Sequence, residues 1–88
     1  MDHIHLGTIK KGQILVEKDE KINFLLLVKT GKIEKLDWNH KPIEVLKPGD
    51  CLGEIPIFYR KHWQFTYKVQ EDSKLWCLEK RYLKNLLS

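Results

Sequence analysis

Six short runs of β-prone residues, separated by turn residues, are spread along this 88-residue chain. The clearest run is residues 63–69, where Trp, Phe, Tyr and Val alternate with Gln, Thr and Lys and so give one apolar and one polar face. Turn-forming residues at 30–31 and 39–41 predict successive hairpins, and residues 48–50 predict another turn. The six runs are residues 13–16, 24–29, 32–38, 42–46, 63–69 and 74–78. This pattern predicts an antiparallel, mainly β fold.

The last residues of the chain follow a helical period instead. Leu83, Leu86 and Leu87 recur at helical spacing beside Tyr82, and basic and polar residues fill the other side. We expect a short helix of about two turns near residues 80–87. Many strands followed by one short helix are typical of an antiparallel jelly-roll barrel, also called a double-stranded β-helix. That barrel is the fold we predict.

Length and charge limit the class of protein. A chain of 88 residues with 42% hydrophobic content is sufficient for one compact domain. We interpret residues 1–88 as a single domain that is a core or a fragment of a larger protein. The net charge of +4 comes from lysines scattered along the chain. Because a nucleic-acid surface usually concentrates its basic residues in a stripe, we do not expect DNA or RNA binding.

The sequence also bears on location. No apolar run approaches the roughly 20 residues that a membrane span needs, and the N-terminus lacks the basic-then-apolar order of a signal peptide. Cys51 and Cys77 lie in no CxxC motif, so we expect both to be reduced thiols. These observations predict a cytoplasmic protein, or the cytoplasmic part of a membrane protein, without direct membrane insertion.

Motifs for catalysis and metal binding are missing from the sequence. There is no nucleophile elbow, no P-loop and no Glu-x-x-His arrangement, and neither serine, Ser73 or Ser88, has a base beside it. His3 and His5 have no further ligand at metal-binding spacing. We therefore expect neither an enzyme, nor a metal site, nor a cofactor.

One segment does point to ligand chemistry. Residues 48–50 form a Pro-Gly-Asp turn, a short apolar step leads to Gly53-Glu54, and the next residues predict one helical turn near 54–59. Glycine allows close backbone approach, and the free N–H groups at the start of a helix bind phosphate. The carboxylate of Glu54 accepts hydrogen bonds from hydroxyls. The pattern suits a ligand that carries hydroxyls and a phosphate.

This segment resembles the phosphate-binding cassette of cyclic-nucleotide-binding domains. The shared pattern is Gly49-Asp50-Cys51-Leu52-Gly53-Glu54-Ile55. The resemblance implies that Glu54 holds the ribose 2′-hydroxyl of cAMP or cGMP and that Gly53 and Ile55 offer backbone contacts. It also implies an attached or partner effector, such as a kinase, a channel or a transcription-factor domain.

The arginine that pairs with the phosphate in this family is missing. Aligned without gaps, its position falls on Trp63, between His62 and Gln64. An indole has one donor and no charge, so it cannot form the bidentate ion pair of an arginine. Arg60 and Lys61 are nearby candidates for phosphate contact. The predicted ligand-binding residues are therefore Gly53, Glu54, Ile55, Arg60, Lys61, Trp63 and Gln64.

Each of these assignments has an alternative. Glu54 suits a helix cap as well as a ligand, Arg60 and Lys61 suit a solvated pair, and Trp63 suits a core or rim aromatic as well as a stacking partner for a purine. Two functions follow. The first is a regulatory module that binds cAMP or cGMP at residues 53–58 and passes the signal to an attached effector. The second is a degenerate domain of the same fold that binds no nucleotide and serves protein–protein interaction.

Overall fold

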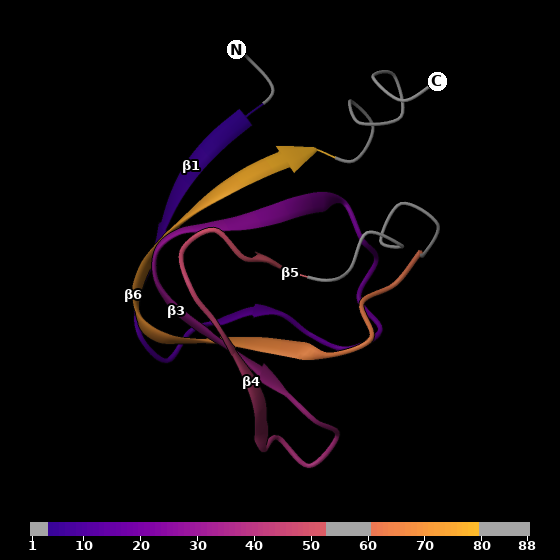
Figure 1. Ribbon diagram of the computed structural model, residues 1–88. Helices are drawn as coiled ribbons and strands as arrows, with labels where there is room; N and C mark the ends of the chain where they lie inside the picture. The colour runs from indigo at the N-terminus through magenta and orange to yellow at the C-terminus, as the bar shows by residue number, and fades with distance from the viewer. Residues whose placement is uncertain (1–3, 53–60, 80–88) are drawn as a thin grey trace.

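The computed structural model describes residues 4–52 and 61–79. Within these ranges all the regular structure is β-strand, in one antiparallel sheet with the path β1-β6-β3-β4 (Figure 1). The strands are β1 (Ile4–Ile9), β2 (Ile14–Val16), β3 (Phe24–Leu36), β4 (Pro42–Leu46), β5 (Cys51–Leu52) and β6 (Thr66–Glu79). The predicted mainly β, antiparallel fold is confirmed. The helices predicted near residues 54–59 and 80–87 lie outside the described residues, and the described part contains no helix that could cross a membrane.

Two long strands, β3 and β6, form the centre of the sheet and belong to both halves of the molecule. The N-terminal half of β3 pairs with the C-terminal half of β6, and β5 and β1 flank this pair. The C-terminal half of β3 pairs with the N-terminal half of β6, and β4 and β2 flank that pair. In Figure 1 both long strands curve from one half into the other. The molecule is therefore one sheet bent over on itself.

The bend of β3 lies at Gly31, where the sequence predicted a hairpin. Gly31 has a φ of 89°, and the register of β3 against β6 shifts repeatedly between Val28 and Ile33. A positive-φ glycine in a bulged strand kinks the strand without reversing it. The hairpin prediction at residues 30–31 is therefore wrong, because residues 24–36 are one strand. The separate runs 63–69 and 74–78 likewise belong largely to one strand, β6.

The hairpin predicted at residues 39–41 is confirmed. The Asp37 N–H donates to the Lys41 carbonyl (2.9 Å). The Asp37 carboxylate accepts the N–H groups of Asn39 (2.8 Å) and Lys41 (2.9 Å). An Asp side chain that bonds to the backbone ahead of it stabilises a tight turn. This turn connects β3 to β4.

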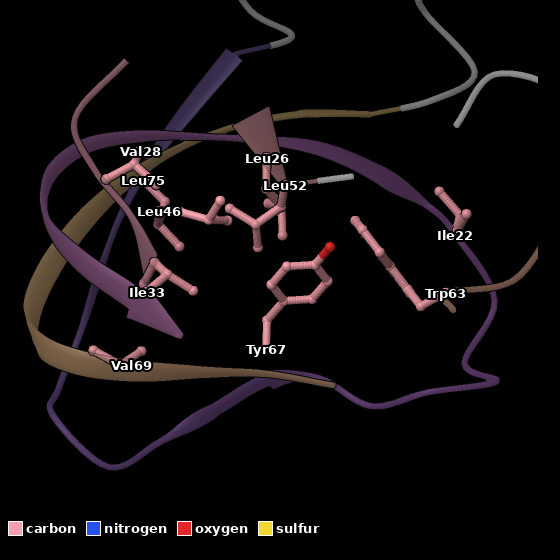
Figure 2. Packing of buried hydrophobic residues seen from close by; sticks show 10 residues of the cluster. All are labelled: Ile22, Leu26, Val28, Ile33, Leu46, Leu52, Trp63, Tyr67, Val69 and Leu75. Atoms are coloured by element: carbon pink, nitrogen blue, oxygen red, sulfur yellow. The ribbon is translucent and has the colours of Figure 1, made fainter. Parts of the chain in front are cut away.

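The hydrophobic core lies between the two halves of the bent sheet. Figure 2 shows Leu26, Leu52 and Leu75 of one half facing Tyr67 and Val69 of the other. The buried members of the cluster are Ile22, Leu26, Val28, Ile33, Leu46, Leu52, Trp63, Tyr67, Val69 and Leu75.

The same packing corrects the prediction of a closed barrel. Among the described strands, the outer strands β4 and β5 do not pair with β1 or β2, so the sheet is open. Strands joined by hydrogen bonds lie about 4.8 Å apart, whereas sheet faces separated by side chains lie about 10 Å apart. The core side chains therefore keep the two halves too far apart for hydrogen bonds between them to close the sheet.

The two cysteines are free thiols, as predicted. The register places Cys77 beside Leu26 and Cys51 beside Leu27, and successive residues of a strand point to opposite faces. The two thiols therefore lie on opposite faces of the sheet. Burial raises the pKa of both thiols, which lowers the fraction of reactive thiolate at neutral pH.

Candidate functional site

The structure describes the framework on both sides of the predicted cassette. Four of the predicted ligand residues, Gly53, Glu54, Ile55 and Arg60, lie outside the described residues. The other three, Lys61, Trp63 and Gln64, are described. Their positions, and those of the residues around them, define the candidate site.

Strand β5 anchors the chain immediately before Gly53. The Gly49 N–H donates to the Val28 carbonyl (2.8 Å), and the Val28 N–H donates to the Asp50 carbonyl (2.9 Å). The Asp50 carboxylate accepts the Lys47 N–H (2.9 Å), and Gly49 has a φ of 96°. This arrangement confirms the predicted turn at residues 48–50. Leu52 is fully buried in the core, so the position at which the cassette begins is fixed.

The chain that follows the cassette is held by a second backbone ladder. The Ile22 N–H donates to the Lys61 carbonyl, and the Trp63 N–H donates to the Glu20 carbonyl, both at 2.8 Å. The Asp19 N–H donates to the Trp63 carbonyl (2.8 Å). The cassette therefore starts and ends at defined points of the framework.

Trp63 occupies the position that the resemblance assigns to the phosphate arginine. Its side chain is only 5% exposed and belongs to the core. It meets Tyr67 edge-on, with ring centroids 5.7 Å apart and planes at 70°. Figure 2 shows Trp63 between Tyr67 and Ile22. Among the described residues, the only buried polar side chains are Thr66 and Ser73, so the described core offers no cation to a phosphate.

A hollow of about 490 Å³ lies against the chain that follows the cassette. It brings together the three described members of the predicted set, Lys61, Trp63 and Gln64. The side chains of Lys61 and Gln64 are exposed there. The complete lining is Lys18, Asp19, Trp38, Lys61, His62, Trp63, Gln64 and Phe65.

Two aromatic residues of this hollow were not predicted from the sequence as site residues. Trp38, in the turn between β3 and β4, stacks on Phe65 with ring centroids 6.3 Å apart and planes at 30°. The Lys35 ammonium lies 4.2 Å from the Phe65 ring centroid and 3.6 Å from Glu44. Trp38 remains 72% exposed. The sequence analysis placed Trp38 at the end of a β-prone run, and no signal in the sequence marked it as a site residue.

The described residues contain no group of three or more His, Cys, Asp or Glu side chains arranged to hold a metal ion. The charged groups at the hollow are also partly neutralised, because the Lys18 ammonium lies 3.0 Å from the Asp19 carboxylate. Lys61 makes no ion pair with the described residues. Of the two lysines that line the hollow, Lys61 is therefore the one available for an anion.

The framework is a β domain in which the chain is anchored before residue 53 and after residue 60, and comparison with known proteins identifies its class. The model of the cyclic nucleotide-binding domain matches residues 6–88. The chain therefore belongs to the cyclic nucleotide-binding domain family. A comparison with curated protein sequences finds no significant match.

Solved structures share the fold at low sequence identity. A PKAR CBD2 bound to Sp-2Cl-cAMPS matches with a TM-score of 0.84 and 23% identity over 98% of this chain and 58% of its own. The C-linker/CNBHD of zELK channels matches with a TM-score of 0.82 and 19% identity, over 96% of this chain and 48% of its own. The sensor domain of the transcriptional regulator DNR from Pseudomonas aeruginosa matches with a TM-score of 0.82 and 17% identity, over 96% of this chain and 62% of its own. The present chain spans less than two thirds of each of these chains.

Proposed function

We propose that this chain is a regulatory module that binds cAMP or cGMP at residues 53–58 and transmits binding to an attached effector. The observation that carries the proposal is membership of the cyclic nucleotide-binding domain family over residues 6–88. The Gly49-to-Glu54 run and the anchored ends of the cassette support it.

Each cassette residue has a chemical role in this proposal. The Glu54 carboxylate accepts hydrogen bonds from the ribose hydroxyl, and the backbone N–H groups of Gly53 and Ile55 face the cyclic phosphate. Charge-assisted hydrogen bonds of this kind are the stronger class. Pro56 contributes no N–H. The buried side chain of Leu52 holds one end of the cassette, and the hydrogen bond from the Ile22 N–H to the Lys61 carbonyl holds the other.

The phosphate charge requires a partner other than Trp63. The indole of Trp63 lies in the core and carries no charge. In our proposal Arg60 and Lys61 supply the positive charge instead. Lys61 is exposed at the hollow and has no ion pair within residues 4–52 and 61–79. A lysine ammonium interacts with a phosphate as a point charge, whereas an arginine guanidinium forms two parallel hydrogen bonds with it. The pairing with Lys61 is therefore less directional than that of an arginine.

The effector is proposed from the kinds of protein that share the fold. These include a channel and a transcriptional regulator, and the matches leave a large part of each such chain uncovered. Residues 80–88, which follow β6 in the sequence, are the segment that would pass a cassette movement to a neighbouring kinase, channel or DNA-binding domain. The module would be cytoplasmic and regulatory, not catalytic.

The proposal is tested by nucleotide titration followed by ¹⁵N-HSQC spectroscopy. We expect cAMP or cGMP to produce saturable shifts at Gly53, Glu54 and Lys61. Glu54→Ala should weaken binding by about 1.5–3 kcal/mol, the value of a hydrogen bond to a charged group. Glu71→Ala is the matched control, because Glu71 is exposed and pairs with Lys32 (3.5 Å) away from the cassette. Equal affinities of Glu54→Ala and the parent protein would contradict the role of Glu54.

One observation favours a second function. The burial of Trp63 suits a domain that keeps the fold for protein contact and binds no nucleotide. Flat spectra from a folded protein at millimolar cAMP and cGMP would support this candidate. Size-exclusion chromatography would then show whether the chain forms a stable oligomer.

A further inference from the structure

We propose that the outer face of the half of the sheet that contains β1 and β5 is a docking surface for an acidic amphipathic helix of a partner protein. The surface consists of Leu27 and Lys29 of β3 and Lys74 and Trp76 of β6, and we call it the basic face. The structure describes all four residues. The inference goes beyond the proposed function, because it requires no nucleotide and applies to either candidate function.

The alternation of the strands places these side chains outside the core. Leu26 of β3 and Leu75 of β6 are buried in the core, so their neighbours along each strand point to the opposite face of the sheet. On that face Leu27 lies between Trp76 of β6 and Cys51 of β5. Leu27 is 37% exposed, and both lysines are exposed. The basic face is therefore an apolar row beside two cations.

The positive charge of the basic face is not neutralised by the described residues. The side chain of Lys74 forms no ion pair or hydrogen bond with them, and the Lys29 ammonium lies 5.1 Å from the centroid of the Trp76 ring. Outside the bend, the described strands of this half contain one acidic residue, Glu79, which strand alternation places on the core side. The carboxylate of Asp50, in the turn before β5, accepts a backbone N–H of its own turn (2.9 Å).

The outer face of the other half of the sheet is different. There Glu34 lies opposite Lys68 of β6 and Val45 of β4, and the Gln70 amide donates to the Glu34 carboxylate (3.0 Å). Charges of both signs are therefore present on that face, whereas the basic face has only cations. Because docking surfaces complement the charge of their partners, the basic face favours an acidic partner.

The dimensions of the basic face fit a helix. Neighbouring strands lie about 4.8 Å apart, so the row of Cys51, Leu27 and Trp76 is roughly 10 Å wide, similar to the diameter of an α-helix. Along β6, the distance from Leu78 to Lys74 is about 13 Å at roughly 3.3 Å per residue, which corresponds to two to three helical turns. An apolar stripe of the partner helix packs on the row, and its acidic residues, one turn further along, pair with the lysines. The bend visible in Figure 1 makes this face convex, so a flat bilayer would contact only its crest.

The test uses three synthetic peptides of about 20 residues, because isolated helices shorter than about 12–15 residues are marginal in water. The first has a leucine stripe flanked by glutamates, the second has the same stripe flanked by lysines, and the third has the glutamates with serines in place of the leucines. Each is titrated into the protein and followed by ¹⁵N-HSQC spectroscopy. We expect the first peptide alone to give saturable shifts, centred on Leu27, Lys29, Lys74 and Trp76.

Charge reversal provides the decisive comparison. Lys29→Glu/Lys74→Glu turns two attractive pairs into repulsive ones, so it should weaken binding of the glutamate–leucine peptide roughly 5- to 30-fold. The same variant should bind the lysine–leucine peptide in its place. Lys21→Glu/Lys41→Glu is the matched control, because it makes the same change in net charge at exposed positions outside the basic face.

A second pair of variants tests the apolar row. Leu27→Thr should weaken binding of the glutamate–leucine peptide. Val45→Thr should not, although Val45 is 36% exposed, nearly as much as Leu27 at 37%. Thr keeps the β propensity of both strands, and a dispersed HSQC spectrum shows that each variant is folded.

Several outcomes would overturn the proposal. One is equal weakening by the two double variants, which would mean that net charge alone attracts the peptide. Another is a parent protein that binds all three peptides alike or binds none. Sedimentation with vesicles of equal parts phosphatidylcholine and phosphatidylserine, lost in Lys29→Glu/Lys74→Glu, would assign the face to a membrane surface instead. A dimer in size-exclusion chromatography that Leu27→Thr dissociates would assign it to a second copy of the chain. None of these results depends on nucleotide, so the proposed function is tested separately.

Discussion

The bend at Gly31 and the rim of the hollow at Trp38, which we call the mouth, lie on either side of the C-terminal half of β3. The two regions differ in what surrounds them. At the bend, Ile33 and Ser73 are buried and the backbones of β3 and β6 are in close contact. At the mouth, Trp38 is largely exposed and a hollow adjoins it. The difference suggests a division of roles, in which the bend supports the stability of the fold and the mouth is free to contact a ligand. Each prediction below tests this division.

Trp63 lines the hollow and also packs in the core. Its replacement therefore tests whether it contributes to the stability of the fold or only to the surface of the hollow. Trp63→Arg removes a buried aromatic and leaves a charge without a partner, and we expect the free energy of unfolding to fall by about 4 kcal/mol or more. Urea denaturation measures the change. Trp63→Phe keeps an apolar ring, so its free energy of unfolding should fall much less than that of Trp63→Arg. An arginine variant as stable as the parent protein would contradict the core position of Trp63.

The arginine variant also separates the two candidate functions. A ligand that binds only the folded state raises its stability, by about 2.7 kcal/mol at a hundred times the dissociation constant. If cAMP raises the melting temperature of Trp63→Arg more than that of the parent protein, the new guanidinium meets the phosphate. No rise in either protein would favour the protein-interaction module.

Gly31→Ala tests the bend directly. An added Cβ would meet the Ser73 hydroxyl and lie 2.7 Å from the Asp72 carbonyl oxygen, and the φ of 89° is unfavourable for alanine. We expect a loss of about 3 kcal/mol from overpacking and backbone strain together. Gly12→Ala is the matched control, because Gly12 has a φ of 90° but no atom within 4 Å of the added Cβ. Equal losses in the two variants would show that the close contact at the bend does not matter.

Ser73→Ala is a milder change at the same place. The Ser73 hydroxyl donates to the Glu71 carbonyl (2.6 Å), so its removal should cost about 1 kcal/mol. In the Gly31→Ala variant, Ser73→Ala should lower the free energy of unfolding by less than it does in the parent protein. The reason is that Ser73→Ala also removes the hydroxyl that the new Cβ at position 31 would meet. A double-mutant cycle by urea denaturation measures this coupling. Simple additivity of the two changes would contradict the contact.

Trp38→Ala should have the smallest effect on stability. Trp38 is exposed and its loss leaves the core cluster intact, so we expect a change of about 0.5 kcal/mol or less, typical of surface positions. Thermal denaturation provides the measurement. A loss comparable to that of Gly31→Ala would show that the mouth supports the fold as much as the bend does.

The sequence predicted the elements whose signals are local. The alternating run that enters β6 and the turn at residues 39–41 depend on neighbouring residues, and both were predicted from the sequence. Strand β1 was missed, because its short apolar alternation is interrupted by Gly7 and its pairing with β6 supplies the stability. The bend at Gly31 was misread as a hairpin, because a glycine between two apolar runs favours a turn and a bulge alike.

The candidate site was predictable to a different degree. The Gly-Asp-x-x-Gly-Glu motif predicted a cassette at residues 53–58, which stays a prediction because these residues lie outside the described part of the chain. The gapless comparison singled out Trp63, which the structure does describe. The sequence alone left open whether Trp63 faces the core or a ligand. The stacking of Trp38 on Phe65 depends on the pairing of β3 with β6, which joins residues far apart in the chain. No local pattern carries that information.

The two shared strands also dictate the order in which the molecule can form. Each half of the sheet needs a part of β6, which is the last of the described strands. During synthesis the first five strands leave the ribosome without the partner that closes the core. Pairing over such long sequence separations is slow, because the entropy of closing the loop is lost before contacts compensate for it. We therefore expect the domain to fold late and as a single cooperative unit.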